Sequence, residues 1–183
     1  GTVDLYGTYL LQWTEINGTC TRRDTVSIDF NEAPDGINAG ADQQLCDTLS
    51  TTLTGTAHTY QGGSEHNGST RTWTWVSGPD NTPTFSDATS PTSDVTVDLY
   101  GTYLFQWTEI NGTCTRRDTV SIDFNEAPDG INAGADQQLC DTLITTLTGT
   151  AYSYQPASEH NGSTRTWSWV SGPDNTPTFI DAA

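Results

Sequence analysis

The chain has 183 residues with 23 acidic side chains, six arginines and no lysine, so its formal net charge is −17. A surface of this sign repels nucleic-acid phosphates and anionic membranes, which argues against both as partners. No apolar run approaches the roughly 18 residues of a membrane-spanning helix, and the acids are spread singly among Thr, Ser and Gly, unlike those of a disordered acidic tail.

A long internal repeat organises the chain. The stretch "VDLYGTYLLQWTEINGTCTRRDTVSIDF" begins at Val3 and returns at Val97, 94 positions later, with Leu11 replaced by Phe105 as the one change. At the same offset the match extends along the rest of the chain with scattered differences, several of them between 58 and 63. A period of about one domain length predicts tandem copies of a domain.

Seven candidate strands follow one another in the central copy. Thr, Ser, Gly, Asn and β-branched residues dominate it, and apolar residues alternate at period two between turn sequences such as "SGPDN" and "NGT". The candidate strands are 39–46, 51–57, 71–78, 82–87, 93–100, 101–110 and 114–124. Seven short strands within one period predict an all-β sandwich.

Alternation also predicts which side chains fill the core of this sandwich. Every second residue of a strand points to the same face of its sheet. The predicted core consists of Trp73, Trp75, Val95, Val97, Leu99, Tyr103, Phe105, Trp107, Val120, Ile122 and Phe124.

The sequence "NEAPDGIN" follows Phe30 and again Phe124, and it is typical of a domain junction because it lacks apolar periodicity. We expect the C-terminal strands of a first repeat at 1–30, a linker at 31–37, a complete repeat at 38–124, a linker at 125–130 and the N-terminal strands of a third repeat at 131–183. Each terminal piece lacks strands to cover its apolar face. We expect residues 1–30 to pack against strands equivalent to 131–183, supplied by a neighbouring copy or a continuation of the same array.

Several segments together resemble a known family. The segments "AGADQQL", "TLTGT", "WTWVSGP", "VTVDLYGTYLFQWTE" and "DTVSIDF", in this order and spacing, resemble a polycystic-kidney-disease-type (PKD) domain. The form they resemble is repeated in giant surface adhesins of gliding bacteria exported by type IX secretion. The resemblance implies tandem immunoglobulin-like, seven-stranded sandwiches that build an extracellular, stiff rod without a catalytic role. The cysteines and the long loop "HTYQGGSEHNGSTR" depart from the usual pattern.

The function expected from this resemblance is that of a structural repeat in a cell-surface adhesin or filament stalk. The alternative is a carbohydrate-binding module of a secreted protein, in which Tyr60 and Tyr154 on the variable loop would stack on a glycan ligand. We expect no enzyme and no cofactor. His66 and Glu65 lie among Gly and Asn on a predicted loop, with no third group to orient them.

Acidic and amide side chains gather at both predicted junctions, where calcium is the one candidate ion. Their oxygens could hold it and stiffen the joint, or they could simply be solvated, and no EF-hand spacing favours the ion. The candidate ligands are Asn31, Glu32, Asp35, Asp42, Asn125, Glu126, Asp129 and Asp136.

Candidate modification sites follow from the resemblance. Secreted proteins of the same bacteria carry O-glycans on Asp-Thr-aliphatic triplets, which occur here as "DTV" and "DTL". The implied O-glycosylation sites are Thr25, Thr48, Thr119 and Thr142.

The four cysteines lie neither in CxxC pairs nor near histidines, so disulfides are favoured over a zinc site. One arrangement pairs Cys46 with Cys114 inside the complete repeat. The other pairs Cys20 with Cys46 and Cys114 with Cys140 across the linkers, but extended chain in a rod separates those residues by tens of ångströms. We expect Cys46–Cys114, with Cys20 and Cys140 bonded to adjacent repeats.

Overall fold

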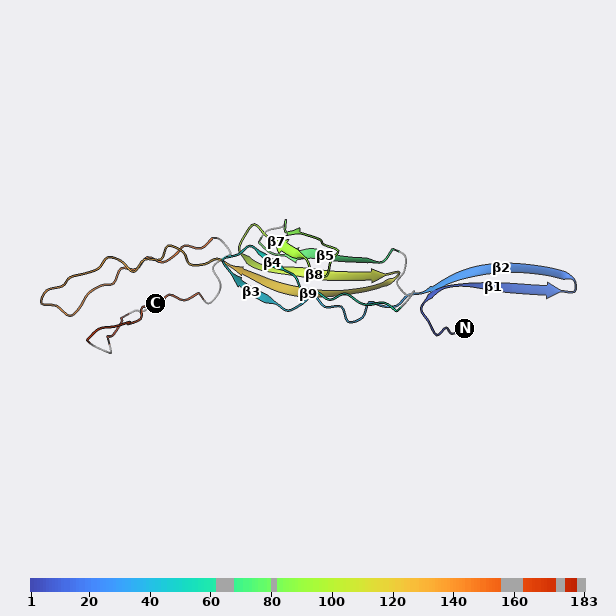
Figure 1. The fold of residues 1–183 in the computed structure, drawn as a ribbon, viewed down its shortest axis with the longest axis horizontal. Helices are drawn as coiled ribbons and strands as arrows, with labels where there is room; N and C mark the ends of the chain where they lie inside the picture. The colour runs from blue at the N-terminus through green and yellow to red at the C-terminus, as the bar shows by residue number, and fades with distance from the viewer. Residues whose placement is uncertain (62–67, 80–81, 156–162, 174–176, 181–183) are drawn as a thin grey trace.

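The computed structural model describes residues 1–61, 68–79, 82–155, 163–173 and 177–180. Across these ranges it contains nine β-strands and no helix, and therefore no helix that could span a membrane. A two-stranded hairpin lies at one end of the elongated molecule, a sandwich lies in the middle, and the described part of 131–180 lies at the other end (Figure 1).

The sandwich is built from seven strands in two sheets. The four-stranded sheet has the order β3-β9-β8-β5 and the three-stranded sheet has the order β4-β7-β6. The strands are β3 (Gln43–Cys46), β4 (Ser50–Thr52), β5 (Thr70–Ser77), β6 (Thr84–Phe85), β7 (Asp94–Thr96), β8 (Gly101–Asn111) and β9 (Cys114–Asn125). All seven predicted strands are present, several of them shorter than predicted, and the predicted all-β, immunoglobulin-like sandwich is confirmed.

The last two strands form the long antiparallel hairpin at the centre of the larger sheet. Their register runs from Gly101 opposite Phe124 to Asn111 opposite Cys114. The first strand, β3, pairs with β9 in parallel, which places Cys46 opposite Asn125. In this register, β3 lies beside the end of β9 and not beside its beginning.

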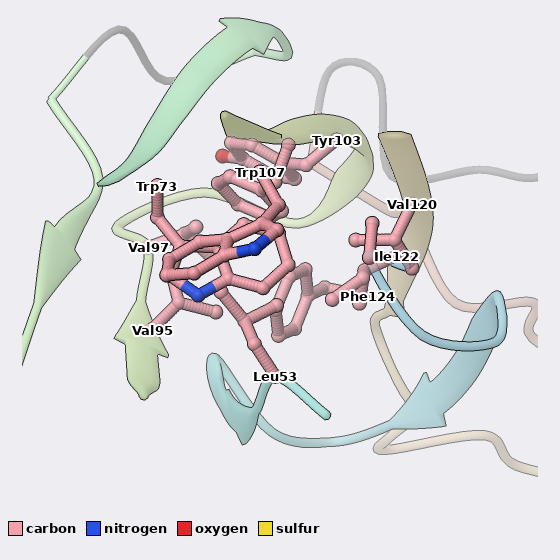
Figure 2. Packing of buried hydrophobic residues seen from close by; sticks show 11 residues of the cluster. Leu53, Trp73, Val95, Val97, Tyr103, Trp107, Val120, Ile122 and Phe124 are labelled. Atoms are coloured by element: carbon pink, nitrogen blue, oxygen red, sulfur yellow. The ribbon is translucent and has the colours of Figure 1, made fainter. Parts of the chain in front are cut away.

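The core lies between the two sheets, where the large side chains point toward one another (Figure 2). The members that are at most 2% exposed are Ala39, Leu53, Trp73, Val95, Val97, Tyr103, Phe105, Trp107, Val120, Ile122 and Phe124. Trp75 is partly buried against this cluster. The prediction for Leu99 is wrong, because β7 ends at Thr96 and the chain bends before Leu99, which is 43% exposed.

Residues 1–30 repeat the last hairpin of the sandwich. The strands β1 (Gly7–Asn17) and β2 (Cys20–Phe30) pair antiparallel from Gly7 opposite Phe30 to Asn17 opposite Cys20, the register of β8 and β9. The described residues of 131–180 contain no strand, but they keep one isolated bridge, Asn132 to Thr150, which matches Asn38 to Thr56 in the sandwich.

Candidate assembly surfaces and repeat junction

The hairpin β1–β2 exposes the apolar face that its counterpart in the sandwich buries. Trp13 is 74% exposed, whereas the equivalent Trp107 is 0% exposed. Val26 is 54% exposed and its equivalent Val120 is 1% exposed. The same amino acids in the same register are thus covered in one copy and uncovered in the other.

In the sandwich, this face is covered by residues that precede β8 in the chain. The ring of Trp73 on β5 lies 5.2 Å from the ring of Trp107, and Phe85 on β6 meets Phe105 edge-on at 5.8 Å. The covering surface belongs to the part of the repeat between β3 and β6. Residues 131–180 carry this part of the repeat a second time.

The described residues of 131–155 hold the local conformation of their sandwich counterparts without strand pairing. Asp47 and Asp141 adopt φ values of 57° and 55°, and Gly40 and Gly134 both adopt 91°. The backbone N–H of Gly134 donates to Oδ1 of Asn132 at 2.6 Å, and the N–H of Gly40 donates to Oδ1 of Asn38 at the same distance. These two turns therefore have the same conformation in both copies.

An open pocket of about 700 Å³ is lined by Leu147, Gly149, Tyr152, Arg165 and Trp167, among others. A Cβ added at Gly149 would lie 2.9 Å from Cζ2 of Trp167, and one added at Gly55 would lie 2.8 Å from Cζ2 of Trp73. The tryptophan therefore packs on the glycine in both copies.

The sandwich shows which side chains fill the equivalent space. Trp73 and Arg71, the equivalents of Trp167 and Arg165, contact Trp107 and Glu109 on β8. The pocket therefore lies where β8 lies in a complete repeat.

A buried carboxylate holds together the end of the sandwich nearest the hairpin β1–β2. Glu109 is 0% exposed, and its Oε1 accepts hydrogen bonds from Nε1 of Trp107 and from the backbone N–H of His58, both at 3.1 Å. Its Oε2 accepts from Nε of Arg71 at 3.3 Å, and that guanidinium lies over the ring of Tyr60 at 5.4 Å. This buried carboxylate is not among the side chains predicted from the sequence. Glu109 lies two residues after the core residue Trp107 on β8, so alternation places both side chains on the same face.

The segment that enters the sandwich from the hairpin is fastened to it by a glutamate. Oε1 of Glu32 lies 3.3 Å from Nε2 of His58, and Oε2 accepts from the backbone N–H of Gln61 at 3.0 Å. At the next junction the equivalent Glu126 accepts from the hydroxyl of Tyr152 at 2.6 Å and from the N–H of Gln155 at 2.8 Å. The two copies differ at this position, His58 in one and Tyr152 in the other, but each side chain binds the equivalent glutamate of its own junction.

Further contacts tie the same segment to the tip of β8–β9. Arg116 forms an ion pair with Asp35 at 2.9 Å, and Nδ2 of Asn111 donates to the backbone O of Glu32 at 2.9 Å. Pro34 is fully buried. These contacts restrict how the hairpin swings against the sandwich.

Several of the calcium candidates are engaged by the protein itself. Asp35 binds Arg116, the Asp42 carboxylate accepts from the N–H of Ser121 at 2.8 Å, and the Asp129 carboxylate accepts from the N–H of Gly130 at 2.7 Å. In the parts of the chain that the structure describes, no group of three or more His, Cys, Asp or Glu side chains is arranged to hold a metal.

The predicted disulfide Cys46–Cys114 is wrong, and all four thiols are free. Cys114 begins β9, whereas Cys46 lies opposite its last residue, Asn125. Eleven steps of extended chain separate these ends by about 36 Å, far beyond the roughly 4.4–6.8 Å between bridged Cα atoms. The prediction failed because it placed the first strand beside the beginning of the last strand.

The remaining predicted sites are the four threonines of the candidate O-glycosylation triplets. Thr25, Thr119 and Thr142 are exposed, and Thr48 is half-buried with its hydroxyl donating to the backbone O of Ser50 at 3.1 Å.

The two candidate glycan-stacking residues already make aromatic contacts inside the chain. Tyr60 packs edge-on against His58 at 4.7 Å, and Tyr154 packs in the same way against Tyr152 at 5.0 Å. His66 and Glu65 lie outside the described residues.

Comparison with known proteins gives structural similarity alone. Neither the family models nor the curated proteins contain a match. The solution structure of the PKD domain from the KIAA 1837 protein is 23% identical, with a TM-score of 0.39, and the match covers 59% of this chain and 98% of that one. The PKD domain of human KIAA0319 is 15% identical with a TM-score of 0.42, covering 54% and 87%.

Domains 4 and 5 of the S-layer protein SbsC are also similar. They are 18% identical with a TM-score of 0.33, and the match covers 65% of this chain and 59% of that one. The fold assignment rests on the strand order and register described above.

Proposed function

We propose that this chain is a structural repeat of an extracellular cell-surface filament or adhesin stalk, and that copies join head to tail. In this assembly the hairpin β1–β2 of one copy fills the pocket of another and completes a sandwich. The observation that supports the proposal is the contrast between Trp13, 74% exposed, and Trp107, 0% exposed. Each large apolar side chain buried in this way contributes about 1.5–3 kcal/mol.

The repeat specifies the contacts of the joined sandwich. Trp13 of one copy packs on Trp167 of the other, as Trp107 packs on Trp73. Glu15 meets Arg165, as Glu109 meets Arg71.

The second ion pair of the complete repeat also has a counterpart across the proposed contact. Arg22 meets Asp129, as Arg116 meets Asp35. Opposite charges therefore face each other at both positions, which favours this register over others.

The occupant of the pocket is a second copy and not the chain's own hairpin. The hairpin β1–β2 and the described part of 131–180, which supplies nearly all residues that line the pocket, lie at opposite ends of the sandwich (Figure 1). The longest strand of the sandwich has 12 residues and therefore spans about 40 Å. A head-to-tail contact that does not close on itself produces an open filament. The contacts of Glu32, Pro34 and Asp35 make each joint stiff, and the role requires neither a catalytic residue nor a cofactor.

Two neighbouring substitutions on β2 test the proposal in the full chain. Val26→Asp places a carboxylate where the equivalent Val120 is buried, and Thr25→Asp places one where Thr119 is exposed. We expect the parent chain and Thr25→Asp to form concentration-dependent oligomers in light scattering under reducing conditions. Val26→Asp should raise the dissociation constant by on the order of 100-fold or more. Equal assembly of the two variants, or a parent chain that stays monomeric, contradicts the proposal.

A further inference from the structure

One asparagine carbonyl marks the end of the sandwich at which the chain leaves for the next repeat. Asn125 is the last residue of β9 and lies opposite Cys46 in the parallel pair with β3. Its carbonyl accepts a hydrogen bond from the backbone N–H of Asp47 at 2.8 Å. Cys46 and its neighbour therefore stand directly beside this carbonyl.

A second cysteine approaches the equivalent carbonyl from the other side of a junction. Sγ of Cys114 lies 3.7 Å from the backbone O of Asn31. Asn31 and Asn125 are the same residue of the repeat, 94 positions apart. The cysteine that opens the last strand of the next repeat therefore lies at the carbonyl of Asn125, on the side where Cys46 stands.

We propose that disulfides cross each repeat junction and link successive copies of this chain, Cys20 of one copy to Cys46 of another and Cys114 to Cys140. This inference rests on the proposed head-to-tail assembly. There, Cys20 takes the place of Cys114 in the joined sandwich and Cys140 takes the place of Cys46. Each contact between copies then carries two disulfides, one at each end of the joined sandwich, and all four cysteines are used.

Exposure of the thiols agrees with bonds formed between copies. Leu45 packs against the core, so Cys46, the next residue of β3, points away from it and is exposed. Cys20 and Cys140 are also exposed, and Cys114 is half-buried beside Asn31. The sandwich therefore does not have to unfold before these thiols react.

The bonds form by thiol–disulfide exchange with a small-molecule disulfide. One cysteine thiolate attacks that disulfide and releases one small thiol, and the second cysteine displaces the other. Two protein thiols and one small disulfide thus become one protein disulfide and two small thiols. The product locks a contact that apolar burial and ion pairs have already aligned.

Paired substitutions that remove the same number of cysteines separate this arrangement from others. The full chain is assembled, oxidised in a glutathione buffer and examined on non-reducing gels, with assembly followed separately by light scattering under reducing conditions. Cys20→Ser/Cys46→Ser should keep a covalent ladder, because Cys114 and Cys140 still bond. Cys20→Ser/Cys114→Ser should lose the ladder, because each remaining cysteine has lost its partner.

Peptide mapping of a mixture of isotope-labelled and unlabelled parent chain identifies the bonds. We expect the peptide pairs Cys20–Cys46 and Cys114–Cys140, with one labelled and one unlabelled member in a statistical share of them. Free thiols in a chain that assembles, or bonds confined to single chains, overturn the disulfides and leave the assembly standing. Absence of any assembly under reducing conditions overturns the proposed function and the disulfides together.

Discussion

The indole rings of Trp73 and Trp107 meet between β5 and β8 with centroids 5.2 Å apart and planes inclined by 46°. Both residues are at most 2% exposed. The repeat supplies the same two tryptophans again, as Trp13 on β1 and as Trp167 in the described part of 131–180. These two segments lie at opposite ends of the molecule (Figure 1). The pair that forms the centre of the complete sandwich is thus present a second time as two halves that one chain cannot bring together.

Glu109 and Glu15 give a matched test of the buried carboxylate. Glu109→Gln removes the charge that binds Arg71 inside the sandwich, and should destabilise that domain by about 1–3 kcal/mol, lowering its Tm by several degrees. Glu15→Gln changes the equivalent exposed residue, so the Tm of the central sandwich should stay constant while assembly weakens. Calorimetry and light scattering measure the two effects, and a Tm lowered equally by both variants would contradict the account.

The joined sandwich should melt before the central one. The two parts of the joined sandwich belong to different chains, whereas the strands of the central sandwich belong to one chain, so only the stability of the joined sandwich depends on concentration. Under reducing conditions, calorimetry should therefore show two transitions, the lower one dependent on concentration.

The Val26→Asp and Thr25→Asp variants supply the control for this prediction. Val26→Asp should lose the lower transition and keep the upper one, and Thr25→Asp should keep both. A lower transition that does not change with concentration would contradict the prediction.

Tyr152 should make its junction sensitive to alkali. The hydrogen bond to Glu126, followed by burial, raises the pKa of the Tyr152 hydroxyl to about 12. Because the neutral hydroxyl donates this bond, the contact is fully present below the ordinary pKa of about 10 and is lost as the pH rises through about 12. Ultraviolet titration of tyrosinate should lose a late step in Tyr152→Phe and keep it in Tyr154→Phe. Identical curves for both variants would argue against the Glu126 contact.

Calcium should have little effect on the junctions. The carboxylates of Asp35 and Asp42 are already bound by Arg116 and by the N–H of Ser121, so an ion would have to displace existing partners. We expect chelation with EDTA to leave the Tm of the central sandwich unchanged. A lower Tm that calcium restores and magnesium does not would establish a specific site.

Alternation predicted the strands and most of the core because a sandwich strand has one buried face. Trp107 and Val120 lie at positions where alternation predicts a buried side chain, and both are buried. Leu99 does not, because the chain leaves β7 before reaching it, and a strand end is poorly marked when apolar residues continue beyond it. Glu109 lies at a position where alternation predicts a buried side chain. Its partner Arg71 lies 38 positions away, and only the fold brings the two together.

The cysteine prediction failed for a different reason. Alternation determines which face a residue occupies, and it carries no information on whether β3 runs parallel or antiparallel to β9. The register of the parallel pairing, with Cys46 opposite Asn125, places Cys46 at the far end of the sandwich from Cys114. Asn31 and Asn125 are equivalent residues of the repeat, so the contact of Cys114 with Asn31 predicts that an equivalent cysteine lies beside Asn125. This places that cysteine near Cys46.

Electron cryomicroscopy of the assembled full chain, at a resolution that shows side chains, tests the central claim most directly. The account predicts a filament in which β1–β2 of each copy completes a sandwich with residues 131–180 of its neighbour, and Trp13 packs on Trp167 across the contact. A filament in which Trp13 faces solvent, or is covered by any surface other than this pocket, would contradict it.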